Sequence, residues 1–490
     1  MPDAIVIGSG PNGLSAAIRL AEAGRSVLVL EAADAPGGAV RTEELTLPGF
    51  RHDTFSSVYP AGAASPVFRR MALAEHGLRW VQPTAAAAHP LPDGRAAILY
   101  RELDRTVASL NALHAGDGDR WAAFAQPFLN ASGAVRHTML AGFPPVTGPL
   151  ELLLRAGPGR LAAFTRLLPE TAVSLGHRLF EGPEARAWLY GAAMHGDVPP
   201  QGHGSAIAAF YLNLLGHVVG WPSPAGGAGA LSDALVSHLR SCGGEVQCGA
   251  RAEAITSDRG RVTGVGVAGG EHHRATLVIA TVMPSALLAL TGDALGGWYR
   301  AGLKAYRQGQ GTLKVDWALD GPIPWMNPEV RTSGTVHVGG TEEEFLESVA
   351  TAAKDRPARP FMLLGQPSVA DPTRAPAGKH TGWAYTHAPP QLLDEPAAQA
   401  DHVDRMEAAV ERMAPGFRDR ILARHVLGPS ALQARDANLV GGDVGGGSYR
   451  LRQVVFRPVP KLDPYRTPLR GLYLGSAAAF PGGAVHGVPG

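Results

Sequence analysis

The sequence predicts an α/β protein with a Rossmann-type parallel sheet at its start, and three observations support this fold class. Residues 4–7 form a short apolar run, a glycine-rich turn follows, and residues 14–21 are apolar at helical spacing. A second apolar run covers residues 26–30 and ends at Glu31, 23 residues after Gly8. This order of strand, turn, helix, strand and acid is typical of a dinucleotide-binding βαβ unit, in which the acid binds a ribose.

The turn of this unit is a GxGxxG sequence, and each glycine has a mechanical role. Gly8 permits the tight turn, Gly10 lets backbone N–H groups approach a pyrophosphate, and Gly13 lets the helix pack close to the sheet. The positive end of the helix dipole then faces the anion. The turn residues that we expect to contact the cofactor are Gly8, Gly10, Pro11, Asn12 and Gly13.

The acid at the end of the second strand narrows the choice of dinucleotide. A carboxylate accepts a hydrogen bond from a ribose hydroxyl but repels the 2′-phosphate of NADP, which leaves FAD or NAD. A glycine pair that lets backbone reach a diphosphate, followed by an arginine, favours FAD. We therefore predict FAD as the cofactor, and this part of its site comprises Glu31, Ala32, Gly37, Gly38 and Arg41.

With these residues the chain resembles the FAD-dependent oxidoreductases of the amine oxidase and phytoene dehydrogenase superfamily. In that superfamily a GGxxRT-type segment and a GFxxD segment follow the βαβ unit, and the second is Gly49, Phe50 and Asp53 here. Matches to the phytoene dehydrogenase-related branch extend over nearly the whole chain; they are residues 249–255, 313–325, 366–387, 415–426, 438–447 and 471–490. These matches indicate the family but not the substrate, because the scaffold of this superfamily oxidises, desaturates or isomerises several classes of compound.

The resemblance implies two interleaved domains, as in amine oxidases and phytoene desaturases. A discontinuous FAD-binding domain would comprise residues 1–60, 221–290 and 431–490. An α+β substrate domain would comprise residues 61–220, expected to be mainly helical with a cap, and residues 291–430, expected to supply an antiparallel sheet. The 490 residues, 45% of them hydrophobic, suffice for more than one core.

The resemblance also assigns cofactor contacts far from the first βαβ unit. A strand at residues 472–474 would deliver a turn to the flavin, and Ser476 and Ala477 stand where relatives usually carry glycine and an acid. The residues placed at the adenine or the flavin are Ala252, Gly475, Ser476, Gly483, Ala484 and Val485.

Two histidines are candidate catalytic residues, His486 beside the flavin segment and His217 just before the chain returns to the FAD domain. Either could act as a base or orient substrate, and the alternative for His217 is a buried hydrogen-bonded histidine. His195, His380 and His387 are further candidates for lining the cavity. No metal site is predicted, because the sequence has neither HExxH nor clustered Cys and His ligands.

The function that these features favour is an FAD-dependent dehydrogenase or desaturase, which transfers hydride from a largely apolar small molecule to flavin N5. Hydride transfer needs geometry and an apolar pocket more than an acid or base, so it leaves little sequence signature. One alternative is a flavin-dependent amine or amino-acid oxidase, which a carboxylate-binding arginine facing the flavin would favour. The other is a non-catalytic flavin-binding or assembly protein. With a single βαβ fingerprint, we expect oxygen, a quinone or a carrier to reoxidise the flavin.

Charge and hydropathy limit the partners of the chain. The 44 basic and 43 acidic residues give a net charge of +1, and without a basic run we expect no nucleic-acid partner. A strand begins directly after Met1 and no run of 18 apolar residues occurs, so we expect a cytoplasmic protein. Residues 146–175 are apolar and carry Arg155, Arg160 and Arg166, a pattern that fits a cap helix and is compatible with peripheral membrane contact.

Overall fold

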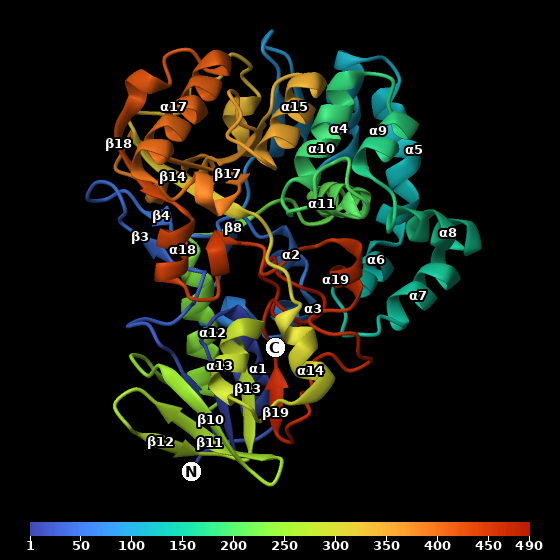
Figure 1. Ribbon diagram of the computed structural model, residues 1–490. Helices are drawn as coiled ribbons and strands as arrows, with labels where there is room; N and C mark the ends of the chain where they lie inside the picture. Colours follow the sequence, from blue (N-terminus) through green and yellow to red (C-terminus); the bar gives the residue numbers. More distant parts are fainter.

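The computed structural model describes residues 1–490 and places two large sheets in opposite halves of the molecule (Figure 1). A five-stranded sheet lies in the lower half, which also contains both chain termini. A seven-stranded sheet lies in the upper half beside a group of helices. The fold class predicted from the sequence, α/β with a Rossmann-type parallel sheet, is confirmed.

The five-stranded sheet has the order β19-β13-β1-β2-β9, and every neighbouring pair is parallel. The apolar residues of β1 are all buried, because both faces of the sheet are covered. Helices α1 and α12 cover one face, and α13, α14 and a three-stranded meander cover the other. The bounds are β1 Ala4–Ile7, α1 Pro11–Glu22, β2 Val27–Leu30, α12 Gly229–Ser241, β9 Glu245–Gln247, β10 Ala252–Asp258, β11 Arg261–Val267, β12 His272–Arg274, β13 Leu277–Ala280, α13 Pro284–Thr291, α14 Gly297–Lys304 and β19 Leu472–Leu474.

The seven-stranded sheet has the order β18-β14-β17-β16-β15-β6-β7, and only the β15–β6 pair is parallel. Alternate residues of β14, among them Val315 and Trp317, pack with α17 in one core, while the opposite face lies against the helical cap. The bounds are β6 Ala85–Pro90, β7 Ala96–Leu99, β14 Gly311–Leu319, β15 Ser333–Val338, β16 Met362–Gly365, β17 His380–Ala388, α17 Pro396–Met413 and β18 Ile421–Leu427.

Strands β6 and β7 differ from the sequence expectation, which treated residues 61–220 as mainly helical. The two apolar runs are joined by Pro92, Asp93 and Gly94, and Gly94 has a φ of 85°. Such a turn favours a hairpin over a continued helix. The hairpin extends the sheet that begins more than 200 residues later, a pairing that local sequence does not reveal.

Eight helices form the cap around a core of aromatic side chains that includes Trp121, Trp188, Phe128 and Phe210. Of these, α7 and α8 project from the margin of the molecule (Figure 1). The bounds are α4 Leu103–Leu113, α5 Asp117–Asn130, α6 Ser132–Met139, α7 Thr147–Ala156, α8 Pro158–Leu167, α9 Ala172–Leu179, α10 Pro183–Ala193 and α11 Ser205–Val218.

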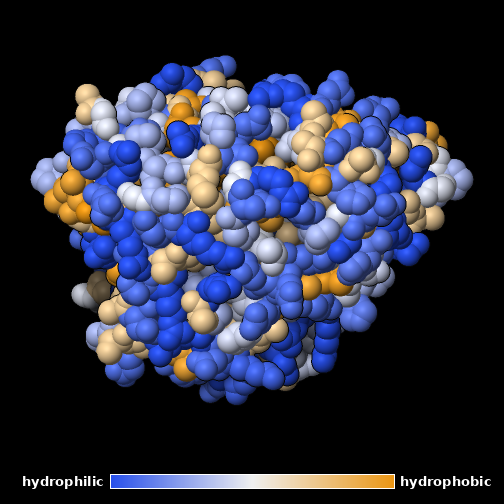
Figure 2. All heavy atoms as spheres, turned by 90° about the horizontal axis from the view of Figure 1, so that it is seen from above, coloured by the Kyte–Doolittle hydropathy of each residue, from blue (hydrophilic) through white to orange (hydrophobic).

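Short helices and strands connect the two halves of the molecule. None of the helices in the chain combines the length and the hydropathy needed to cross a bilayer. The upper surface is mostly hydrophilic, with scattered apolar side chains (Figure 2). The remaining elements are β3 Thr42–Glu43, β4 His52–Asp53, α2 Pro60–Ala64, α3 Pro66–Arg70, β5 Trp80–Val81, β8 Ser223–Pro224, α15 Glu342–Ala352, α16 Pro367–Ala370, α18 Pro429–Arg435 and α19 Leu451–Val455, with single-turn 3-10 helices between them.

Candidate active site

The turn between β1 and α1 shows why its glycines are needed. A Cβ on Gly13 would lie 2.0 Å from the Gly8 carbonyl oxygen, and a Cβ on Gly8 would lie 2.6 Å from Thr281 Oγ1 at the end of β13. No atom lies within 4 Å of the corresponding position at Gly10. Gly8 and Gly13 are therefore required by the fold itself, whereas Gly10 leaves open space before the N-terminus of α1, where a pyrophosphate fits.

The glycine pair after β2 packs directly onto this turn. A Cβ on Gly38 would lie 3.1 Å from the Gly10 Cα, and the Gly37 N–H donates to Ser9 Oγ over 3.1 Å. Arg41 follows, and its buried Nε has no hydrogen-bond partner in the protein. An orphaned guanidinium donor next to two glycine turns fits a bound diphosphate.

Glu31 is held at the carboxyl end of β2 by three hydrogen bonds. Its Oε2 accepts from the Ser9 N–H (2.9 Å) and Ser9 Oγ (2.6 Å), and its Oε1 accepts from the Ala33 N–H (2.9 Å). The Ala250 N–H donates to the Glu31 carbonyl over 2.8 Å, which brings the chain leading to Ala252 alongside. The residues predicted for the ribose and the adenine are thus neighbours, and the carboxylate keeps lone pairs for a ribose hydroxyl. Ala32, between Glu31 and Ala33, is exposed.

The C-terminal segment meets the same edge of the sheet. The Gly475 N–H donates to the Ala280 carbonyl over 3.0 Å, and Ser476 is buried with its Oγ accepting from the Ala478 N–H. The last residue, Gly490, lies against the first turn of α1, because a Cβ on it would be 1.8 Å from the Asn12 carbonyl oxygen. Pro11, the first residue of α1, accepts from Ser15 Oγ through its carbonyl.

Two residues of this segment adopt a backbone conformation that side chains disfavour. Ala484 has a φ of 83° and Val485 a φ of 49°. A β-branched residue with positive φ is an outlier, and such strain costs on the order of 1–3 kcal/mol and concentrates at functional sites. The preceding Gly483 donates its N–H to Tyr449 Oη over 2.6 Å, which anchors the turn. The strain supports a functional role for residues 483–485.

The two candidate catalytic histidines lie in different places. His486 is buried directly after the strained turn, its carbonyl accepts from Ser65 Oγ (2.6 Å), and its Nδ1 accepts from the Val488 N–H (3.2 Å). His217 lies inside the cap, where its Nε2 accepts from Trp121 Nε1 (3.1 Å) and its Nδ1 faces the Arg101 carbonyl (3.3 Å). Burial lowers the pKa of each imidazole to about 4. With both nitrogens engaged, His217 has the geometry of a structural histidine.

A buried charge cluster is the main feature that sequence reasoning missed. Lys314 and Asp316 form an ion pair, Arg374 Nη2 lies 2.8 Å from Asp53 Oδ1, and His52 Nδ1 lies 3.7 Å from Asp316 Oδ1. None of the five residues is more than 3% exposed. Burial raises the pKa of Asp316 to about 6 although Lys314 opposes the rise, and burial and the two cations lower the pKa of His52 to about 3. The sequence signal that could have indicated this cluster is the pair of charged residues, Lys314 and Asp316, at alternate positions of the otherwise apolar strand β14.

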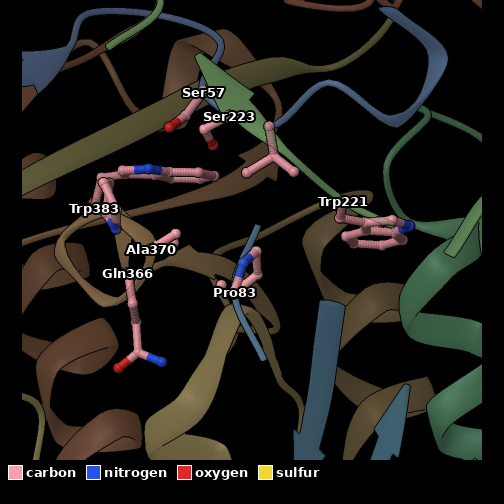
Figure 3. A pocket seen from close by; sticks show the side chains of 11 residues that line it. Ser57, Pro83, Trp221, Ser223, Gln366, Ala370 and Trp383 are labelled. Atoms are coloured by element: carbon pink, nitrogen blue, oxygen red, sulfur yellow. The ribbon is translucent and has the colours of Figure 1, made fainter. Parts of the chain in front are cut away.

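A small cavity (Figure 3) is linked to this cluster through one of its lining residues, Ser57. Ser57, Trp221 and Trp383 are among its lining residues, and Ser57 Oγ donates to Asp53 Oδ2 over 2.6 Å. The Trp383 Nε1 is buried without a hydrogen-bond partner. The cavity volume of about 10 Å³ accommodates one water molecule.

Aromatic and imidazole rings continue along β17 from this cavity. The Trp383 and Tyr385 rings are stacked at 6.0 Å, and Tyr385 meets His387 edge-on at 5.2 Å. His195 Nε2 lies 3.0 Å from His337 Nε2. Burial lowers the pKa of His195 to about 3 and that of His387 to about 4, so both rings are neutral at pH 7. His380 begins β17 at its other end.

One arginine lies against the flavin segment predicted from the sequence. Arg457 is fully buried, its Nη2 donates to the Gly446 carbonyl (2.5 Å) and to Tyr306 Oη (2.7 Å), and its Nε and Nη1 have no partner. A Cβ on Gly482 would lie 3.0 Å from Arg457 Nη1, and the Tyr449 ring lies 4.7 Å from the guanidinium carbon. The sequence pattern gave no reason to single out this residue.

The parallel sheet, the glycine turns, the acid at the end of β2 and the strained C-terminal turn are together the features of an FAD-dependent oxidoreductase. More specifically, the chain belongs to the family described as flavin containing amine oxidoreductase, which matches residues 12–488. FAD is the cofactor, and the resemblance drawn from the sequence is confirmed.

Curated relatives span the chain almost completely. Pyridine nucleotide-disulfide oxidoreductase domain-containing protein 2 of Rattus norvegicus is 29% identical over 542 residues, covering 100% of this chain and 92% of the relative. A limonene dehydrogenase component of Castellaniella defragrans is 24% identical and phytoene desaturase (neurosporene-forming) of Cereibacter sphaeroides 25% identical, each covering 99% of this chain and 92% of the relative.

Solved structures share the fold at low sequence identity. An oxidoreductase from Methanosarcina mazei superposes with a TM-score of 0.67 at 17% identity, covering 99% of this chain and 98% of its own. Putrescine oxidase bound to putrescine superposes with a TM-score of 0.60 at 16% identity, covering 99% and 96%. These likenesses show the fold and leave the substrate open.

Proposed function

We propose that this protein is an FAD-dependent dehydrogenase or desaturase that removes a hydride from a largely apolar small molecule. The observation that carries the proposal is the lining beside the cavity, where Trp221, Trp383 and Tyr385 are joined by the neutral rings of His195 and His387. Burying an unpaired charge against such a lining is costly, so an uncharged substrate is favoured. The names of the limonene dehydrogenase component and the phytoene desaturase, both relatives of this chain, support the same class.

The chain would bind the cofactor and exclude water from the reacting atoms. Gly10 would leave room for the diphosphate, Gly38 lets the second glycine turn pack onto Gly10, the Arg41 guanidinium would supply a donor, and Glu31 would accept from the ribose. When bound, FAD supplies the hydride acceptor. The stacked Trp383 and Tyr385 would orient an apolar chain or ring, since aromatic faces bind such groups without requiring charge.

Anaerobic titration of the purified flavoprotein with a panel of compounds tests this proposal. Isoprenoid compounds should bleach the flavin absorbance, whereas amines and hydroxy acids should not. NADH and NADPH belong in the same panel and should leave the flavin oxidised, because one βαβ fingerprint provides no second site to position a nicotinamide. Rapid bleaching by either nicotinamide would contradict the dehydrogenase assignment, and a flavin that no compound reduces would favour the non-catalytic alternative.

Oxidation of an amino acid is the second candidate function, and Arg457 is the observation that favours it. Two nitrogens of its fully buried guanidinium lack partners, beside the segment predicted to contact the flavin. A guanidinium in this state suits a substrate carboxylate. Amino acids in the panel discriminate the two functions. Bleaching by an amino acid, lost in Arg457→Met and retained in the control Arg25→Met at an exposed arginine, would show that the substrate is an amino acid and not an apolar compound.

A further inference from the structure

We propose that helices α7 and α8 dock this protein onto the surface of an anionic lipid bilayer. The contact would be made by an apolar stripe on α7, here called the α7 patch, which consists of Val146, Leu150, Leu153 and Leu154. These side chains are 64%, 52%, 36% and 76% exposed. Residues 150, 153 and 154 share one helix face because they are separated by three and four positions. Monomeric proteins rarely leave such a stripe in water without a partner.

The opposite face of α7 explains why the patch is presented outward. Leu152 is fully buried in the core of the cap. Gly148 packs so closely on α6 that a Cβ there would lie 2.3 Å from the Thr138 backbone nitrogen. The helix therefore cannot rotate to bury its leucines without losing both contacts. Figure 1 shows α7 and α8 projecting from the margin of the molecule.

The charges around the patch select an anionic bilayer over other apolar partners. Between Leu152 and Pro169 the chain carries Arg155, Arg160 and Arg166 and no acidic residue. All three arginines are exposed. Glu151 is the one acidic residue of α7, and it is hydrogen-bonded to His137. An apolar helix face flanked mainly by cations is the pattern of helices that lie in a lipid interface, where each cation near an anionic surface adds to binding.

The α7 patch is also connected to the flavin segment. Phe143, three residues before Val146, packs edge-on against Phe480 at 5.2 Å and against Phe456 at 6.5 Å. The Phe143 N–H donates to Tyr465 Oη, which in turn donates to the Phe480 carbonyl. A docked bilayer would thus lie beside the loop that packs on the C-terminal cofactor segment. Docking at this place would shorten the path of an apolar substrate from the membrane to the flavin. That consequence rests on the proposed function, whereas the docking proposal does not depend on it.

Vesicle flotation of the FAD-loaded protein tests the proposal without a substrate. The protein should float with phosphatidylcholine vesicles that contain 30 mol% phosphatidylglycerol and much less with phosphatidylcholine alone. The double variant Leu150→Asp/Leu154→Asp should bind at least about tenfold more weakly. Replacing Arg155, Arg160 and Arg166 by Gln should weaken binding about fivefold per charge at low salt and less at high salt.

Leu422→Asp is the matched control. Leu422 is 46% exposed on β18, at the far margin of the molecule from α7 (Figure 1), and this variant should float like the parent. Flavin absorbance and melting temperature should be unchanged in every variant, because all the changed side chains are exposed. Failure of the parent to float with anionic vesicles would overturn the proposal. So would light scattering that shows a dimer dissociated by Leu150→Asp/Leu154→Asp, since the patch would then bind a second copy of the chain.

Discussion

At the scale of single residues, glycines that look alike in the sequence have different physical roles. Gly13 is required because a Cβ would collide with the Gly8 carbonyl oxygen at 2.0 Å, whereas Gly10 borders open space. We therefore expect Gly13 to be required for the fold and Gly10 for binding of the ligand. This difference separates an effect on stability from an effect on FAD binding.

Replacement of these two glycines by alanine should therefore give opposite results. Gly10→Ala should leave the melting temperature of the apoprotein unchanged and weaken FAD binding, because its Cβ occupies the space of the diphosphate. Gly13→Ala should lower the melting temperature itself, since the helix must move away from the turn. Calorimetry of the apoproteins and FAD titration measure both effects. Equal FAD affinity in Gly10→Ala and the parent would show that the diphosphate lies elsewhere.

Glu31→Gln should weaken FAD binding without unfolding the chain. The loss should be about 1.5–3 kcal/mol, the contribution of a hydrogen bond to a charged group. The amide oxygen of Gln can replace only one of the two carboxylate oxygens, so either the Ser9 donors or the Ala33 N–H lose their acceptor, and the melting temperature of the apoprotein should fall although the chain still folds. Glu22→Gln, at the end of α1, is the control and should bind FAD like the parent. An unchanged affinity in Glu31→Gln would show that the carboxylate does not contact the ribose.

At the scale of elements, β14 carries a buried ion pair within an otherwise apolar strand. Its residues Lys314 and Asp316 face Tyr385 and Trp383 of β17 in the sheet register. The ion pair therefore borders the aromatic rings that line the proposed substrate site. Buried pairs are costly to desolvate, and removing one partner is worse than removing both.

Lys314→Met should destabilise the protein by about 3–5 kcal/mol at pH 7.5, because it leaves the Asp316 carboxylate buried and unpaired. At pH 5 the loss should be smaller, since burial already raises the pKa of Asp316 to about 6 and the variant can protonate it. Lys314→Met/Asp316→Leu should recover most of the stability. Urea unfolding at both pH values measures this, and a double variant as unstable as the single one would contradict the argument.

At the scale of the whole molecule, burial of neutral histidines makes stability depend on pH. Burial lowers the pKa of seven histidines from 6.5 to about 3 or 4. These histidines are His52, His89, His195, His217, His387, His402 and His486. Below about pH 6.5 the unfolded chain takes up protons that the folded chain does not accept until about pH 4. Their contribution to stability is therefore complete above pH 6.5 and is lost as the pH falls toward 4.

The free energy of unfolding should consequently fall steeply between pH 6.5 and pH 4. Asp316, Asp233, Asp436 and Asp443 act in the opposite direction, because burial raises the pKa of each and lets the folded state bind a proton first, but they are four groups against seven. Denaturant titrations at constant ionic strength should give a slope near pH 5.5 of more than about 1.4 kcal/mol per pH unit, the value for one proton. A flat profile in this window would show that the histidines are accessible to protons in the folded state.

Much of the cofactor site was predictable because its residues act through local backbone geometry. Gly8, Gly10, Gly13 and Glu31 belong to one contiguous strand, turn, helix and strand, and the spacing alone specifies what each can do. The strained φ at Val485 could not be predicted, because a β-branched residue avoids positive φ unless tertiary contacts impose it. The β6–β7 hairpin was missed for the same reason, since its partner β15 is remote in the sequence.

The sequence by itself determined the fold class, the FAD cofactor and the superfamily, because each depends on short motifs whose chemistry is local. Only the tertiary structure showed that His52, Asp53, Lys314, Asp316 and Arg374, from segments up to 322 residues apart, form one buried cluster beside the cavity. It also showed which side chains of the apolar segment 146–175 face the core, by burying Leu152 and leaving Leu154 in solvent. Hydropathy records how apolar a side chain is, but which face of a helix meets water depends on what the rest of the chain packs against it.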